Sequence, residues 1–235
     1  MGVMNQNSVG TAHVRVQNVS KKYKDHNVLA LQNVNLHIAR GKLVALMGPS
    51  GCGKTTLLNC LGGLDVPDEG SITIGDSSLS SMNEMQLTIL RRQKIGFVFQ
   101  FFNLLPTLSV AENVALPLQL NGGMSSKEID ARVLAVLEKL SISERRTFYP
   151  AQLSGGEMQR TAVARAIVHK PQLILADEPT GNLDSANGVA VLNILQGLCR
   201  DQNETIIMAT HSPEAAEYAD FVVHMKDGQI TEPSS

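Results

Sequence analysis

The chain has 235 residues, of which 43% are hydrophobic and 18% charged, and its formal net charge is −2. This length supports one sizeable domain that carries a subdomain. The near-neutral charge and the scarcity of aromatic residues (4%, no Trp) disfavour a nucleic-acid partner. Residues 1–10 lack the apolar core of a signal peptide, and the longest apolar runs are strand-sized, so a membrane role would need a partner. The three cysteines lack metal-ligand spacing, which is typical of a reducing cytoplasm.

The first third of the chain predicts strands around one short helix. Residues 1–12, rich in Asn, Gln and Ser, are expected to form a flexible terminus. Apolar residues alternate in the next two segments, which predicts antiparallel strands ahead of a continuously apolar, buried strand. The expected elements are strands over 13–19, 33–38 and 43–47, a helix over 55–61, a strand over 70–75, a polar loop over 77–81, a helix over 83–92 and a strand over 95–99.

Residues 100–152 are expected to form a helical subdomain inserted into an α/β lobe made of 13–99 and 153–235. Ser125 and Glu128 form a capping box, which predicts a helix start followed by a core-facing apolar stripe. That stripe comprises Ile129, Val133, Val136, Leu137 and Leu140. A helix over 157–168 and strands over 173–176, 205–209 and 220–225 complete the lobe. The predicted fold is therefore an α/β phosphate-loop NTPase with a parallel core sheet, an antiparallel β subdomain and the helical insertion.

The most informative segment is a complete phosphate-loop pattern, G-x-x-x-x-G-K-[ST], between the expected strand and helix. Its glycines let N–H groups converge on phosphate oxygens, and the helix N-terminus adds partial positive charge. Lys54 is expected to reach the β- and γ-phosphates, and the Thr55 hydroxyl to ligate Mg²⁺. The flanking strand and helix disfavour a mere glycine-rich turn. The expected contacts to ATP here are Gly48, Pro49, Ser50, Gly51, Cys52, Gly53, Lys54, Thr55 and Thr56.

Two carboxylates follow the apolar strand that ends near residue 176. In a parallel sheet the ligand site lies at the carboxyl ends of the strands, so both acids should emerge beside the phosphates. Asp177 is expected to hold Mg²⁺ with Thr55, and Glu178 to polarise an attacking water. An acidic strand end that caps the next helix is the plainer alternative.

A second anion-binding helix start is expected at Ser154, Gly155 and Gly156, directly before Glu157. A hydroxyl and bare N–H groups at a helix N-terminus suit a phosphate. Alone, this pattern would also fit an ordinary helix cap.

Together these motifs resemble the ATP-binding subunit of an ATP-binding-cassette (ABC) transporter, over essentially all of 13–232. The family's Walker A motif matches 48–55, its signature motif matches 153–157, and its Walker B motif matches 173–177 with the catalytic Glu178. Its Q-loop matches Gln100, its D-loop 181–184 and its switch histidine His211.

The resemblance implies that two copies form an ATP-dependent, head-to-tail homodimer with two equivalent sites. The signature motif of one copy, including Glu157, would close on the γ-phosphate held by Lys54 of the other, and Asp184 would organise the interface. The implied catalytic residues are Glu178, His211 and Gln100. The implied metal ligands are Thr55, Gln100 and Asp177. Tyr23 matches the aromatic residue that stacks on adenine.

Two segments, 99–117 and 177–184, look like the macrolide-efflux and lipoprotein-release branch of the family. That branch works with a separate integral-membrane permease, joined in some relatives by a periplasmic adaptor. The chain is thus expected at the cytoplasmic face of the inner membrane, held there by its permease. Ser212 and Phe221 stand where relatives often carry Asp and Arg, but neither removes a catalytic group.

The expected function is ATP hydrolysis that powers an export or extraction complex. The ATPase of an importer would use the same catalytic core. A soluble cassette ATPase of translation or DNA repair is disfavoured, because such proteins usually carry two cassettes or a long coiled-coil insertion. A nucleotide-regulated binding module without turnover is disfavoured because Glu178 and His211 are both present.

Overall fold

The computed structural model describes residues 12–23 and 28–231. Strand β1 (Ala12–Tyr23) already begins at the last residue of the expected flexible terminus, and residues 1–11 lie outside the described part of the chain. Across that described part, no helix combines the length and apolar character that a bilayer crossing requires.

An antiparallel sheet is built from strands in the order β2-β1-β4-β5. Its members besides β1 are β2 (Val28–Ala39), β4 (Glu69–Ile74) and β5 (Ser77–Ser78). The prediction of a polar loop over 77–81 was wrong. Ser77 and Ser78 pair with β4, and Leu79–Ser81 forms a 3₁₀ turn because Leu79 is buried and the Ser80 hydroxyl accepts from the Ile72 amide at 3.1 Å.

The central sheet has six strands in the order β10-β9-β3-β8-β7-β6, with β10 antiparallel and the other five parallel. The strands are β3 (Leu43–Met47), β6 (Ile95–Phe99), β7 (Leu173–Asp177), β8 (Thr205–Thr210), β9 (Phe221–Lys226) and β10 (Gln229–Thr231). The helices are α1 (Lys54–Leu61), α2 (Glu84–Lys94), α3 (Val110–Asn121), α4 (Ser126–Lys139), α5 (Gly155–Ile167), α6 (Ser185–Gln202) and α7 (Pro213–Ala216). This arrangement confirms the predicted α/β fold class.

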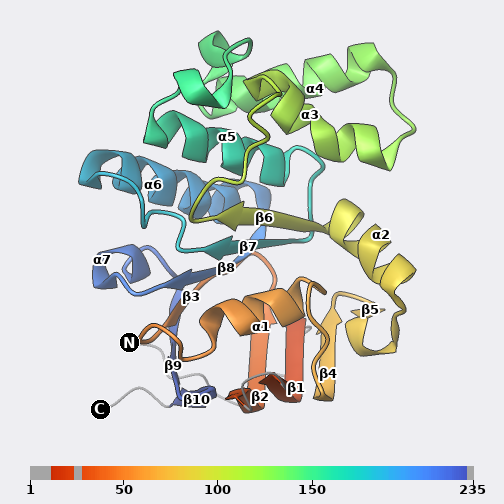
Figure 1. Cartoon of the computed structure of the whole chain (residues 1–235), viewed down its shortest axis with the longest axis vertical. Helices are drawn as coiled ribbons and strands as arrows, with labels where there is room; N and C mark the ends of the chain where they lie inside the picture. The colour runs from red at the N-terminus through yellow and green to blue at the C-terminus, as the bar shows by residue number, and fades with distance from the viewer. Residues whose placement is uncertain (1–11, 24–27, 232–235) are drawn as a thin grey trace.

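Alternate residues of the parallel strands enter two separate cores, as the strand periodicity requires. Leu43 and Ala45 of β3 pack with α3, α4, α5 and α6, whereas Val44 and Leu46 pack with α1 and the antiparallel sheet. Figure 1 shows these two layers on opposite sides of the central sheet. Helices α1 and α5 therefore lie on opposite faces.

The segment between β6 and α5 contains α3, α4 and two 3₁₀ turns. The predicted capping box of Ser125 and Glu128 is present: the serine hydroxyl accepts from the Glu128 amide, and the carboxylate accepts from the Ser125 amide at 2.7 Å. The expected apolar stripe packs in the core with α3 and α5, which confirms its structural role.

Asn113, on α3, ties the loop after β6 to that helix. Its side chain is fully buried; Oδ1 accepts from the Leu105 amide at 2.8 Å, and Nδ2 donates to the Leu105 and Leu108 carbonyl oxygens. Asn113→Leu should therefore lower the free energy of unfolding by about 1–3 kcal/mol, since buried polar groups would lose their partners. Urea denaturation measures this loss. Gln119→Leu, at an exposed position on the same helix, should change the free energy of unfolding by no more than about 0.5 kcal/mol. Equal losses in both variants would contradict the role of Asn113.

Candidate nucleotide-binding site

The phosphate loop joins the carboxyl end of β3 to the first turn of α1. Gly53, the N-cap, has φ 106°, and an added Cβ would lie 2.5 Å from the Ala30 carbonyl oxygen, so only glycine fits there. Lys54 is 8% exposed; its ammonium donates to the carbonyl oxygens of Gly48 (2.7 Å) and Pro49 (3.0 Å) and lies 3.9 Å from Cys52 Sγ. No ion pair joins it to any carboxylate of the described residues. A desolvated cation that has neutral partners alone retains its attraction for an anion.

Thr55 and Asp177 come together at the carboxyl edge of the central sheet. The Thr55 hydroxyl donates to Asp177 Oδ2 at 2.9 Å, although 122 residues separate the two in sequence. Burial raises the pKa of the Asp177 carboxyl, while the Thr55 hydrogen bond opposes that rise. The pair places two hard oxygen donors side by side at the start of α1.

Glu178 and His211 also meet at this edge. The His211 Nδ1 lies 2.9 Å from Glu178 Oε1 and donates to it, which leaves Nε2 free. Glu178 has φ 47°, a left-handed conformation that non-glycine residues rarely adopt. Such backbone geometry persists only where the surroundings enforce it, and it is enriched at functional sites. Here the Glu178 amide donates to the Ala209 carbonyl oxygen at 3.0 Å.

The signature motif starts α5 with a complete capping box. The Ser154 hydroxyl accepts from the Glu157 amide, and Glu157 Oε2 accepts from both the amide (2.8 Å) and the hydroxyl (2.9 Å) of Ser154. Glu157 Oε1 accepts from Arg145 Nε at 2.7 Å. The hydrogen bond from Arg145, with those from Ser154, lowers the pKa of Glu157 to about 2. The Glu157 carboxylate is therefore engaged within the chain.

Asp184 caps α6 and connects to the signature motif. Its carboxylate accepts from the amide (2.9 Å) and the side-chain Nδ2 (2.7 Å) of Asn187. A Cβ added to Gly156 would lie 2.0 Å from Asn187 Oδ1, so the absence of a side chain at 156 lets α6 approach α5 closely. Helix α6, which Asp184 caps, is thus packed against the signature motif of the same copy.

Gln100 follows β6 and lies beside the segment 181–182. A Cβ added to Gly181 would lie 3.0 Å from Gln100 Nε2, and Asn182 Nδ2 donates to the Gln100 carbonyl oxygen at 2.9 Å. The structure therefore sets Gln100 beside residues 181–182.

Arg165 of α5 holds the loop that follows Gln100. It donates to the carbonyl oxygens of Phe102 (2.8 Å) and Asn103, both of which have positive φ. Burial lowers the pKa of Arg165, but an arginine remains charged at neutral pH. Two charge-assisted hydrogen bonds thus tie this loop to the signature helix.

Tyr23 is 37% exposed at the end of β1. Its hydroxyl donates to Asp65 at 2.7 Å, Asp65 pairs with Lys21 at 2.7 Å, and the Lys21 ammonium lies 5.5 Å from the tyrosine ring centroid. Asp65 therefore holds the Tyr23 hydroxyl, and Lys21 lies against the ring.

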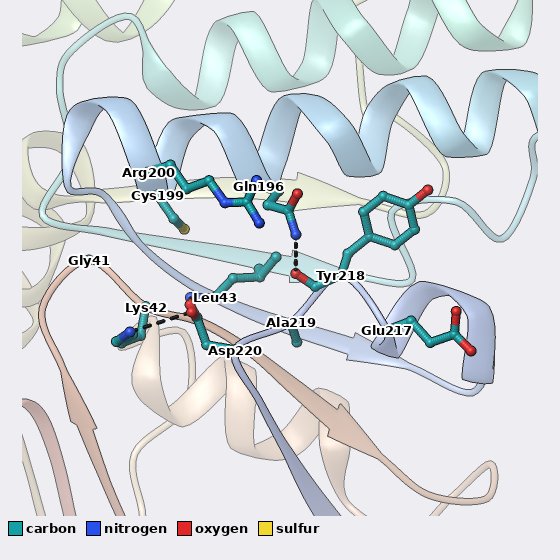
Figure 2. A pocket seen from close by; sticks show the side chains of 10 residues that line it. All are labelled: Gly41, Lys42, Leu43, Gln196, Cys199, Arg200, Glu217, Tyr218, Ala219 and Asp220. Atoms are coloured by element: carbon teal, nitrogen blue, oxygen red, sulfur yellow. Dashed lines mark hydrogen bonds and ion pairs between the residues drawn. The ribbon is translucent and has the colours of Figure 1, made fainter. Parts of the chain in front are cut away.

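A cavity of about 400 Å³ lies at the opposite end of β3 from the phosphate loop. Figure 2 shows its lining, in which Gln196 donates to the Tyr218 carbonyl oxygen at 2.9 Å and Lys42 faces Asp220. Asp220 also accepts from the Leu43 amide at 2.9 Å. The lining includes none of the phosphate-loop residues, nor Asp177, Glu178 or His211, so the cavity is separate from the candidate site.

Three contributors to the site were missed by sequence reasoning: Arg145, Arg165 and Asn187. Asn187 had a local signal, because it lies three residues after a capping Asp. The two arginines act on partners 12 and more than 60 residues away, and no periodicity marks such contacts.

The fold and the lysine loop, with its Thr55–Asp177 pair and the adjacent Glu178–His211 pair, define a phosphate-loop nucleoside triphosphatase. Residues 31–181 match the ABC transporter family. The ABC transporter ATP-binding protein MJ0796 of Methanocaldococcus jannaschii is 43% identical over 222 residues, which cover 92% of this chain and 94% of that protein. A dimeric structure of MJ0796 bound to ADP and Pi has a TM-score of 0.86 at 42% identity, covering 93% of this chain and 97% of that one. The chain belongs to the ABC transporter family, as an ATP-binding subunit.

Two further relatives define the branch. The lipoprotein-releasing system ATP-binding protein LolD of Legionella pneumophila is 44% identical over 216 residues, covering 91% of this chain and 95% of that protein. The macrolide export ATP-binding/permease protein MacB of Syntrophobacter fumaroxidans is 44% identical over 225 residues, covering 94% of this chain but 31% of that longer protein. These similarities confirm the LolD/MacB-like branch predicted from the sequence.

Proposed function

We propose that this chain hydrolyses ATP between two copies of itself and thereby drives an export or extraction complex through a separate membrane permease. The observation that carries the proposal is the pairing of Glu178 with His211 beside the Thr55–Asp177 pair. A carboxylate oriented by a histidine can polarise an attacking water, and a positioned general base contributes about 10²- to 10⁴-fold. Gln100 is proposed to join them once the nucleotide is bound.

Mg²⁺ fits the residues present. The Thr55 hydroxyl and Asp177 carboxylate are oxygen donors 2.9 Å apart, and Mg²⁺ is typically held by one or two such protein ligands plus phosphates and waters. Thr55, Asp177 and Gln100 are the proposed ligands. Bound there, Mg²⁺ would neutralise charge on the β- and γ-phosphate oxygens. Lys54 and the amides of the loop from Gly48 to Thr56 would bind the phosphates, and Tyr23 would stack on adenine.

A second copy is needed because one copy separates its two anion-binding helix starts. Helix α1 packs on one face of the central sheet and α5 on the other, which favours a second copy as the source of the signature motif that meets a phosphate held by Lys54. A head-to-tail pair would place the signature motif of each copy, Ser154 to Glu157, over the nucleotide of its partner, with Asp184 nearby. The dimeric MJ0796 cassette bound to ADP and Pi supports this proposal.

The permease and the direction of transport are proposed from the named relatives. LolD belongs to a lipoprotein-releasing system and MacB joins ATP-binding and permease parts in one macrolide-export protein. By analogy, this chain would lie at the cytoplasmic face of the inner membrane beneath a permease, with a periplasmic adaptor as a further partner. Phe101, next to Gln100, and Leu105 are both exposed, and they offer apolar contacts for the permease.

Co-purification tests this assignment. The tagged chain should retain an integral-membrane permease with a large extracytoplasmic domain, and adding that permease in lipid should change the rate of MgATP hydrolysis severalfold. Recovery of an importer permease with a solute-binding protein would instead identify the alternative, an importer ATPase. Glu178→Gln serves as the matched control, since it should retain the permease while losing hydrolysis.

A further inference from the structure

The carboxylate of Glu157 places a negative charge at the turn that is proposed to meet the γ-phosphate. Both of its oxygens are occupied, one by Ser154 (2.8 and 2.9 Å) and one by Arg145 (2.7 Å). A neutral glutamine would complete the same capping box. The charge itself is thus unnecessary for starting α5, and it opposes the approach of a phosphate unless it is neutralised.

Arg145 is held in place by contacts other than its ion pair. Its guanidinium carbon lies 4.9 Å from the Phe148 ring centroid. The backbone that follows it is anchored to α3: the Val110 amide donates to the Phe148 carbonyl oxygen (2.8 Å), and the Ala111 amide donates to that of Arg146 (2.9 Å). Arg145 is therefore presented to Glu157 by the helical subdomain.

The Arg145–Glu157 pair is poorly suited to stabilising the fold. The Arg145 side chain is 43% exposed and that of Glu157 18% exposed, and exposed pairs of this kind contribute little to stability. Glu157 has no other cationic partner among the described ion pairs.

We infer that Arg145 is a positioning residue that neutralises Glu157 and so sets the MgATP concentration at which two copies close. The inference rests on the proposed head-to-tail dimer and adds a determinant of its affinity. Without Arg145, the Glu157 carboxylate would face the partner's γ-phosphate as an unpaired like charge, a juxtaposition that interfaces tolerate poorly. With Arg145 present, the turn would meet the phosphate as a neutral, hydrogen-bonded cap.

The test uses the full-length chain carrying Glu178→Gln, with dimer formation followed by light scattering across an MgATP titration. Adding Arg145→Gln, which removes the charge and keeps a polar side chain, should raise the half-maximal MgATP concentration about tenfold. Arg145→Lys retains the charge, so its half-maximal MgATP concentration should stay within about threefold of the parent value. Arg146→Gln makes the same charge change at the exposed neighbouring residue and should shift the half-maximal MgATP concentration by less than about twofold. Circular dichroism and MgATP binding by the monomer establish that each variant is folded.

A charge-neutral background separates charge from packing. In Glu157→Gln, Arg145→Gln should change the half-maximal concentration by less than about twofold, because no carboxylate remains to be neutralised. An equal loss in both backgrounds, or no loss in either, would overturn the inference while leaving the proposed dimer intact. A Glu178→Gln parent that stays monomeric with MgATP would overturn both.

Discussion

Glu178→Gln should lower the steady-state rate of ATP hydrolysis by about 10²- to 10⁴-fold, while MgATP still binds and holds two copies together. The amide keeps the size and the hydrogen-bonding contact with His211 that the carboxylate has at 2.9 Å, but it cannot accept a proton from water. Binding and closure depend on the phosphate loop and the signature motif, which the substitution leaves unchanged. Phosphate release and size-exclusion chromatography with light scattering measure the two effects.

Two matched variants make this result interpretable. Glu217→Gln removes an exposed carboxylate that lines the cavity at the start of β3 and should leave hydrolysis within about twofold. His211→Ala should also slow hydrolysis, because Glu178 would lose the partner that orients it. Hydrolysis by Glu178→Gln at close to the normal rate would remove Glu178 from its proposed role.

Lys54→Ala should weaken MgATP binding to the monomer by at least about thirtyfold, equivalent to roughly 2 kcal/mol. The Lys54 ammonium is buried, and its present partners are the carbonyl oxygens of Gly48 and Pro49. Phosphate oxygens would replace those dipoles with full negative charge, an attraction that alanine cannot supply. Isothermal titration calorimetry gives the Kd directly.

The control for this prediction is Lys42→Ala at the opposite end of β3. Lys42 forms a 3.4 Å ion pair with Asp220, and both side chains are 39% exposed, so its loss should leave the Kd for MgATP unchanged within about twofold. An unaltered Kd in Lys54→Ala would show that the loop binds nucleotide without its lysine.

The fold was predictable wherever a pattern is local. The apolar run 43–47 predicted a strand buried on both faces, and the Ser125–Glu128 spacing predicted a helix start; both are present. The 77–81 segment was mistaken for a loop because four serines surround the one buried leucine that organises it. The pairs Thr55–Asp177 and Glu178–His211 could be anticipated because parallel strands deliver their carboxyl ends to one edge.

The contacts around the signature motif could not be anticipated in this way. Arg145 reaches Glu157 across a 3₁₀ turn, and Asn187 reaches Gly156 from another helix, so both depend on how α3, α5 and α6 pack. Packing of helices is set by side-chain shape over many residues, which no short motif encodes.

Arg165 has a mechanical consequence. It fastens the backbone at 102–103 to α5 about 17 Å from Ser154 along the helix axis. Separating that loop from the helix would break two charge-assisted hydrogen bonds of a half-buried guanidinium, so the two move as one stiff piece. A force applied at the exposed ring of Phe101 would then tilt α5 and move Ser154 at its N-terminus, because the loop and the helix would move together.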